Sequence, residues 1–231
     1  MARPTGEVSV RAKSARDRSR ADVGSRRAER RVRHRDLSRT QLLDAAEAVF
    51  ADRGYHATTL KEVADLAEFS VGSIYSFFTN KEDLYVNVFL RRGSEFLPGM
   101  RAAIEGSEDP LDQLHALVDF EVQYFRDHAH FGQLYLRSAR ELPGLADFSE
   151  VPELSANFDA AMELHAEVFA RGQRARRFRA GDPRVLARLL SGLISAYQSV
   201  DPAVTADGDD APEGLAITAL VEIIDAAFRR P

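Results

Sequence analysis

The feature that most constrains this chain is a set of closely spaced helix-start signals between residues 59 and 84. Thr59 and Glu62 form a Thr-x-x-Glu capping box, in which each side chain bonds to the backbone N–H of the other residue. Ser70 and Asn80 are two further N-cap residues. Helix starts this close together predict two short helices, a tight turn and the beginning of a longer helix. This arrangement is typical of a helix-turn-helix, whose second helix enters the DNA major groove.

A further amphipathic helix is predicted directly upstream, over residues 39–51. Its apolar residues recur at steps of three and four, and it ends in a glycine, Gly54, suited to a left-handed C′ position. This helix would cover the back of the helix-turn-helix. We therefore expect a three-helix DNA-binding domain over residues 36–96, with the reading segment at 59–78.

This segment resembles the N-terminal domain of the tetracycline-repressor (TetR) family, in residue type, order and spacing. The resemblance extends from Ala45 to Leu84, whereas the rest of the chain has the length and helical texture of the family without a diagnostic motif. The matching residues are Ala45, Ala46, Phe50, Gly54, Tyr55, Thr58, Thr59, Val63, Ala64, Ala67, Ser70, Gly72, Tyr75, Phe78, Lys81, Glu82 and Leu84.

The resemblance implies an all-helical homodimer with a C-terminal ligand pocket, and repression that a small molecule relieves. It also implies that Thr59, Tyr75 and Lys81 contact phosphates, while the residues from Val71 to Ser73 face base edges or their surroundings. The candidate DNA-binding residues are Thr59, Ser70, Val71, Gly72, Ser73, Tyr75, Phe77 and Lys81.

Two residues of this segment depart from the family pattern. Glu68 stands where the family usually has a turn glycine, so a left-handed backbone there would be strained or replaced. Phe77 stands where Tyr or His is common, so a phosphate hydrogen bond would be lost at that position. These departures also support an alternative, a helical interaction protein with a degenerate DNA reader.

Composition and charge indicate an all-α protein with one large or two modest domains. The 231 residues are 45% hydrophobic, and no 18-residue apolar run or secretory leader is evident, so we expect no membrane partner and a cytoplasmic location. The absence of cysteine excludes disulfides and thiolate chemistry. No phosphate loop, nucleophile elbow or metalloprotease motif is present, so an enzyme is the least favoured reading, and we expect no cofactor.

A net charge of −5 conceals a basic N-terminus. Residues 1–37 contain 12 Arg or Lys and 5 Asp or Glu, a net charge of +7, so the rest of the chain carries −12. Residues 1–35 are poor in large apolar side chains, which predicts a disordered basic arm. Such an arm either follows DNA phosphates and the minor groove or only adds non-specific charge, and the sequence favours neither.

The remaining residues, 97–231, are predicted to form a helical ligand-binding and dimerisation domain. Pro98-Gly99 is expected to break or bend the helix that begins after Asn80. The last two helices, near residues 182–199 and 212–228, are richer in apolar residues than a one-sided surface helix needs. We interpret them as a homodimer face, although ordinary core packing would give the same pattern. A two-fold dimer would require double-stranded DNA with a near-palindromic operator.

An apolar cavity in this domain would hold the unknown small-molecule effector. Its aromatic candidates favour an apolar or aromatic ligand, although any one of them is more often a core residue. The candidate lining residues are Phe120, Tyr124, Phe131, Tyr135, Phe158, Met162, His165 and Phe169. Four histidines raise a metal alternative that the sequence does not favour, since no cysteine or carboxylate cluster accompanies them: His115, His128, His130 and His165.

Overall fold

The computed structural model describes residues 7–141, 151–206 and 213–230 of the chain, and these residues form helices and one isolated bridge, between Phe178 and Arg229. The all-α prediction is confirmed. The helices are α1 (Glu7–Ala57), α2 (Leu60–Leu66), α3 (Val71–Tyr75), α4 (Lys81–Glu105), α5 (Pro110–Asp127), α6 (Ala129–Glu141), α8 (Pro152–Arg174), α9 (Pro183–Gln198), α10 (Pro202–Thr205) and α11 (Ile217–Phe228).

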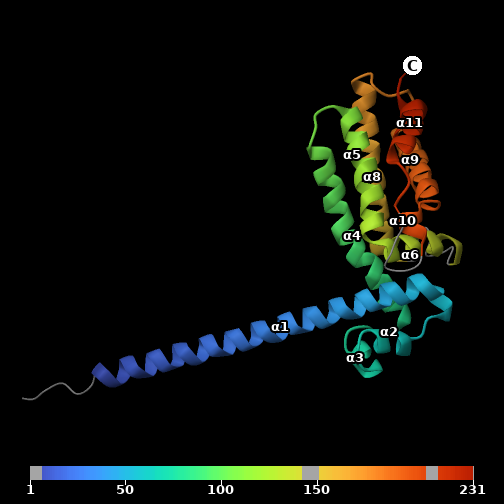
Figure 1. Ribbon diagram of the computed structural model, residues 1–231. Coiled ribbons are helices and arrows are strands. Elements are labelled where there is room, and N and C mark those ends of the chain that lie inside the picture. The colour runs from blue at the N-terminus through green and yellow to red at the C-terminus, as the bar shows by residue number, and fades with distance from the viewer. Residues whose placement is uncertain (1–6, 142–150, 207–212, 231) are drawn as a thin grey trace, which may run out of the picture. The chain divides into compact units, whose positions relative to one another are not determined.

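The chain divides into two units, residues 1–42 and 43–231. In the first unit, α1 begins at Glu7, so most of the expected disordered arm is drawn as helix (Figure 1). The physical reason is local: this segment is rich in arginine and alanine, which favour a helix, and a helix needs no apolar face to satisfy its backbone. Residues 29–37 are exposed along it. A DNA contact by this arm remains a prediction.

In the second unit, α4, α5, α8, α9 and α11 run lengthwise beside one another, and α3 lies at the end opposite α11 (Figure 1). Helix α8 packs against α4, α5 and α9. Burying one face of each helix yields a single apolar core for this bundle. Its most buried members include Met100, Leu114, Leu117, Val118, Val168, Phe169, Ala187, Leu190 and Ile224.

Helix α4 is longer than the sequence predicts, because Pro98 does not break it. Met100 and Ile104, which follow this proline, are buried, and their packing outweighs the backbone hydrogen bond that proline removes. Gly99 permits the close approach of α5, since an added Cβ would lie 2.2 Å from Phe120 Cζ. One continuous helix therefore crosses the expected domain boundary between residues 96 and 97.

Helix α11 begins later than expected, at Ile217 rather than near residue 212. The backbone just before it is held by side chains of the bundle instead of by helical hydrogen bonds. Arg126 Nη2 and Tyr197 Oη both donate to the carbonyl of Leu215, each at 2.6 Å. The N–H of Leu215 donates to Asp201 Oδ1 at 3.0 Å. Tertiary hydrogen bonds thus delay the start of the helix.

Candidate DNA-binding surface and ligand cavity

All three predicted helix caps of the reading segment are present. The Thr59–Glu62 capping box is complete, with Thr59 N donating to Glu62 Oε2 at 2.8 Å and Glu62 N donating to Thr59 Oγ1 at 3.3 Å. The backbone bond from Thr59 is the main cause that lowers the pKa of Glu62. Ser70 Oγ accepts from the N–H of Ser73 at 3.1 Å, and Asn80 caps α4 in the same way. These local bonds set where α2, α3 and α4 begin.

The turn between α2 and α3 passes through a left-handed residue, Glu68, with φ of 59°. Its N–H donates to the carbonyl of Asp65 at 3.3 Å, and that of Phe69 donates to Ala64 at 2.8 Å. The departure from glycine therefore leaves the left-handed turn in place. A non-glycine residue pays about 1–2 kcal/mol for this conformation.

Helix α3 is anchored on one side and open on the other. Ile74 is fully buried, whereas Tyr75 is 58% exposed and Ser70 and Gly72 are exposed. Val71 and Ser73 are half-buried. The exposed side presents small and hydroxyl-bearing residues, which suit close approach to a duplex groove.

Gly72 is not required by the packing of the chain itself. A Cβ added there would have Ser70 Oγ as its nearest neighbour at 3.7 Å, which is an ordinary van der Waals contact. The backbone of Gly72 also has no positive φ. Any requirement for glycine at this position must therefore come from a partner that approaches α3.

Lys81, for which the resemblance implies a phosphate contact, bonds to the backbone within the chain. Its Nζ donates to the backbone carbonyls of Tyr55 at 2.8 Å and Thr58 at 3.0 Å, and it lies 4.5 Å from the centre of the Tyr55 ring. The Tyr55 carbonyl belongs to the last turn of α1 and the Thr58 carbonyl directly follows its end, so the ammonium group satisfies backbone acceptors at this helix terminus. The internal bonds compete with the phosphate contact that we expected for Lys81.

Phe77, the other departure from the family pattern, is half-buried and lies beside Phe78, with ring centres 6.3 Å apart. Its ring offers no hydrogen-bonding group to a phosphate. The neighbouring hydroxyl of Ser76 donates to the carbonyl of Ser73 at 2.6 Å. The end of α3 is thus closed by packing and by a local hydrogen bond.

A cavity of about 100 Å³ lies among α4, α5, α6, α8 and α9. Five of the eight residues that we predicted to line a pocket do line it: Phe131, Tyr135, Phe158, Met162 and His165. Additional lining residues that the prediction missed include Phe96, Phe125, Leu154, Asn157, Ser191, Ile194 and Gln198. The wall is therefore mainly apolar and aromatic, with a few polar groups.

The other three predicted residues lie outside the cavity wall. Phe120 packs over Gly99, and the hydroxyl of Tyr124 donates to the carbonyl of Arg92 at 3.1 Å. Phe169 is fully buried between Phe178 and Phe228. All three belong to helices that also carry residues of the cavity wall. Helical spacing alone does not tell which apolar residues of a helix line the cavity and which pack elsewhere.

Polar side chains of the cavity wall meet across helices. Glu121 interrupts an apolar stripe of α5, and it meets His165 of α8 with an Nε2–Oε1 distance of 2.5 Å. Gln198 of α9 reaches the backbone of Glu121, with Nε2 donating to its carbonyl at 3.4 Å. Because Glu121 interrupts an apolar stripe, the sequence already indicated it as a polar group of a pocket, whereas nothing marked Gln198.

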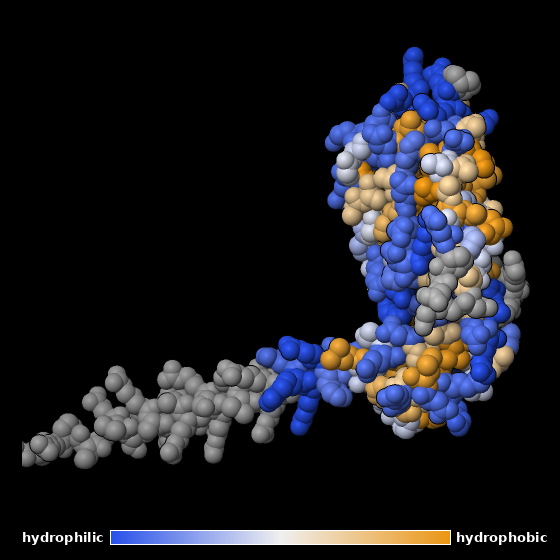
Figure 2. Space-filling model, viewed as in Figure 1, coloured by the Kyte–Doolittle hydropathy of each residue, from blue (hydrophilic) through white to orange (hydrophobic). Residues whose placement is uncertain are grey.

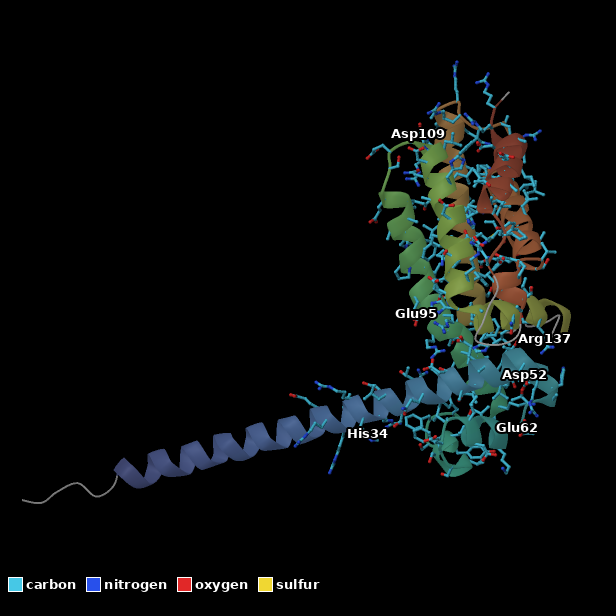
Figure 3. The ribbon with its side chains drawn as sticks, viewed as in Figure 1. His34, Asp52, Glu62, Glu95, Asp109 and Arg137 are labelled. Carbon is cyan, nitrogen blue, oxygen red and sulfur yellow. The ribbon has the colours of Figure 1, made fainter. Side chains whose placement is uncertain are left out.

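Arg92 connects the cavity wall with the end of α1. It lines the cavity, and its guanidinium bonds Glu47 through Nε and Nη2 and Glu95 through Nη1. Burial by itself lowers the pKa of Arg92, but the hydrogen bonds that Arg92 donates to Glu47, together with the charge of Glu47, hold this pKa above its ordinary value. Arg137 of α6, seen beside Asp52 in Figure 3, adds a second connection, because its Nη1 donates to the carbonyls of Ala51 and Asp52.

The histidines are dispersed in the structure. His115 pairs with Asp225 at 2.8 Å, His165 pairs with Glu121, and the ring centre of His128 lies 4.5 Å from that of Tyr124. Within the described residues, no group of three or more His, Asp or Glu side chains is placed to hold a metal ion.

Helices α9 and α11 carry an exposed apolar face in addition to their buried one. Val185, Leu189 and Ile223 are each more than half exposed, and Gly192 has no neighbour within 4 Å of an added Cβ. Figure 2 shows apolar side chains gathered over these helices.

No helix in the described part of the chain has both the length and the apolar character needed to cross a bilayer.

The exposed α3, its capped neighbours and the cavity-bearing bundle define a helix-turn-helix protein with a helical C-terminal body. Residues 42–88 match the family model described as "Bacterial regulatory proteins, tetR family". The match covers the helix-turn-helix segment, from the last part of α1 to the first part of α4.

Curated proteins similar to this chain carry regulator names. The "HTH-type transcriptional activator FasR" of Mycolicibacterium smegmatis is 32% identical over 140 residues, 61% of this chain and 59% of that protein. The "HTH-type transcriptional repressor KstR2" of Mycobacterium tuberculosis is 31% identical over 116 residues, 50% of this chain and 58% of that protein. The "Fatty acid metabolism regulator protein" of Bacillus subtilis is 31% identical over 78 residues, 34% of this chain and 40% of that protein. The matched regions thus span less than two thirds of each relative.

Solved structures share the fold over most of the chain. The regulator FadR from Bacillus subtilis, solved in complex with stearoyl-CoA, has a TM-score of 0.67 at 19% identity and covers 81% of this chain and 97% of its own. A TetR-family regulator from Agrobacterium tumefaciens has a TM-score of 0.68 at 20% identity, and the match covers 85% of this chain and 100% of that chain. At these identities the likeness establishes the fold alone.

Proposed function

We propose that this protein is a DNA-binding transcriptional regulator that a small, largely apolar molecule releases from its operator. The observation that carries the proposal is the open side of α3, where Tyr75 is 58% exposed while Ile74 anchors the helix from behind. A short helix held this way can enter the major groove without loss of its own packing. Thr59 and Tyr75 are proposed to contact phosphates, and Val71, Gly72 and Ser73 to lie at the base edges.

The regulator is proposed to act as a homodimer through α9 and α11. Their exposed side chains would bury apolar surface against a second copy, and Gly192 leaves room for close approach of helices. A two-fold dimer presents its two α3 helices to sites about 34–36 Å apart, which suits a near-palindromic operator. Dimerisation would therefore place two short reading helices on one operator and so increase the specificity of DNA binding.

The effector is proposed to bind in the cavity among α4, α5, α6, α8 and α9. An aromatic and apolar wall with few polar groups suits a largely apolar ligand. The names of several relatives point to similar chemistry, since they mention fatty acid metabolism, stearoyl-CoA and ketosteroids. The cavity is proposed to bind this ligand and not to convert it, which makes the chain a sensor without catalytic activity.

Arg92 is proposed to couple ligand binding to the release of DNA. It lines the cavity and also forms a hydrogen bond with Glu47 in the last part of α1. A ligand can change DNA affinity only by the difference in its affinity for the two conformers. Ligand in the cavity would favour a position of α4 in which the two α3 helices no longer match adjacent turns of the duplex. Repression relieved by ligand is the expected direction.

The decisive experiment is the recovery of genomic DNA fragments by the purified protein, followed by measurement of affinity for the recovered sequence. We expect a near-palindromic site bound with a Kd far below the non-specific range of about 10⁻⁴–10⁻⁶ M. Gly72→Ala is expected to abolish that affinity while the fold is kept, because the added methyl group meets only ordinary contacts within the chain.

The matched control is Val200→Ala, which shortens a side chain that is 64% exposed on the helical body. It should bind the recovered site like the unmodified protein. Fragments bound no better than random DNA, or full operator binding by the Gly72 variant, would refute the DNA-reading role of α3.

A further inference from the structure

Two ionisable side chains face each other inside the cavity wall. Glu121 is 6% exposed and His165 is 1% exposed, and their Oε1 and Nε2 atoms lie 2.5 Å apart. The wall around them is otherwise mainly apolar and aromatic. Burying such a pair costs desolvation energy that its mutual attraction does not always return, so apolar packing alone gives no reason for it.

The second ring nitrogen of this histidine has no hydrogen-bond partner among the protein atoms described. His165 Nδ1 is buried and unpaired, while Nε2 is taken by Glu121. Proteins seldom leave a buried polar atom without a partner, because its desolvation costs about 1–3 kcal/mol. Since His165 belongs to the cavity wall, a ligand in the cavity is placed to supply the missing partner.

The charge of the pair decides which partner Nδ1 requires. The pair is neutral overall when a carboxylate faces an imidazolium, or when a protonated carboxyl donates to a neutral ring. In both forms Nδ1 carries a hydrogen and is a donor. Only a pair with a net charge of −1 would leave Nδ1 as an acceptor, and a buried net charge without compensation is strongly disfavoured. Nδ1 therefore requires an acceptor atom.

The surroundings favour an uncharged acceptor over a carboxylate. The Glu121–His165 pair is neutral overall in both of these forms, and a carboxylate ligand would add a buried net charge beside it. The guanidinium of Arg92, which also lines the cavity, is engaged by Glu47 and Glu95. A carbonyl oxygen meets the requirement of Nδ1 without adding charge.

We propose that the cavity recognises an apolar or aromatic molecule through one uncharged carbonyl group, whose oxygen accepts a hydrogen bond from His165 Nδ1. Glu121 is a positioning residue, which holds the ring through Nε2 and leaves Nδ1 to face the ligand. This inference rests on the proposed function only in taking the cavity as the effector site. It adds the chemical group that the effector must carry.

The test compares three probes of nearly equal shape on the full-length protein by calorimetry: acetophenone, α-methylstyrene and benzoate. The first has a carbonyl, the second replaces its oxygen with CH₂, and the third is an anion. We expect acetophenone to bind about tenfold more tightly than either of the others, since the hydrocarbon leaves Nδ1 unpaired and the anion adds charge. The resonance of the His165 Nδ1 nucleus in ¹⁵N-histidine NMR should report a protonated nitrogen.

Two matched histidine variants separate the cavity effect from a general effect on the fold. His165→Gln keeps an N–H donor that can reach Glu121 but removes the second ring nitrogen, so the preference for acetophenone should disappear. His115→Gln makes the same change in a pair outside the cavity, where His115 Nε2 and Asp225 Oδ1 lie 2.8 Å apart, and should keep the preference.

Equal affinity of the unmodified protein for acetophenone and α-methylstyrene would overturn the carbonyl assignment, as would tighter binding of benzoate or an unprotonated Nδ1. The NMR result does not depend on any variant being folded. If none of the probes binds, both this inference and the effector role of the cavity fail. Failure to retain operator DNA without any probe would instead overturn the regulator function and leave the carbonyl result standing.

Discussion

Arg92 binds both carboxylate oxygens of Glu47, with Nε 2.8 Å from Oε2 and Nη2 2.7 Å from Oε1. The two residues belong to α4 and to the last part of α1, and both side chains are almost fully buried. Arg91 adds a third bond to the same carboxylate, at 2.7 Å. A bidentate pair of this kind has a narrow range of favourable geometries, so it ties the direction of α4 to the end of α1.

Replacement of this carboxylate should destabilise the protein strongly. Glu47→Gln leaves the charges of Arg91 and Arg92 buried beside an uncharged amide, and we expect the free energy of unfolding to fall by about 3 kcal/mol. Urea denaturation measures this loss. Arg184→Gln is the control, because its pair with Glu163 is exposed and should contribute almost nothing. Equal stability of the two variants would show that the Glu47 pair does not restrain α4.

Removing the backbone strain at the left-handed residue Glu68 should stabilise the protein. Glu68→Gly removes the strain of a positive φ, partly offset by the greater freedom of glycine in the unfolded chain, and we expect a gain of about 1 kcal/mol. Thermal and urea denaturation both report it. Ala67→Gly, one residue earlier at a φ of −78°, should lower stability instead. A loss of stability in the Glu68 variant would mean that its side chain stabilises the turn.

Removal of the ammonium group that closes the end of α1 should affect the fold more than the electrostatics of DNA binding. Lys81→Ala leaves the carbonyls of Tyr55 and Thr58 without their donor, and we expect a loss of about 2 kcal/mol in unfolding free energy. The slope of log K against log salt for DNA binding should stay unchanged. A slope reduced by about 1, with stability intact, would instead assign Lys81 to a phosphate. Lys61→Ala, at an exposed pair with Asp65, controls for the loss of a surface ammonium.

A charge placed on the exposed apolar face of the last two helices should separate the proposed dimer. Leu189→Arg changes a side chain that is 56% exposed in the single chain, so the fold of each subunit should survive. Sedimentation velocity is expected to show a monomer, together with weaker operator binding. Val200→Arg alters an equally exposed site and should remain dimeric. A dimer that persists in the Leu189 variant would place the interface elsewhere.

The DNA-reading segment was the part best predicted from the residues, because its determinants are local. A cap such as Thr59 or Ser70 bonds to a backbone only three residues away, so its role is readable from the spacing. Gly54 has the positive φ expected of it, for the same reason. At Glu68 the sequence left open whether the left-handed turn would be strained or replaced, and the structure keeps it.

The residues that line the cavity were predicted only in part. Helical periodicity indicates which face of a helix is apolar, but it does not indicate whether that face packs against another helix or lines a cavity. Phe120 and Phe169 share apolar stripes with their neighbours, yet one covers Gly99 and the other fills the core. Glu121 and His165 are 44 residues apart in sequence, and the residues around each of them do not predict their contact. Such pairs depend on how α5 and α8 pack.

The sequence by itself determined the starts of α2, α3 and α4, the left-handed Gly54 and the all-α class, because each depends on contacts within a few residues. Only the tertiary structure decided that Lys81 closes α1, that α4 continues past Pro98, and that Arg92 links the cavity to Glu47. These relationships join residues far apart in the chain. Their energies depend on distances between packed helices, which no local pattern encodes.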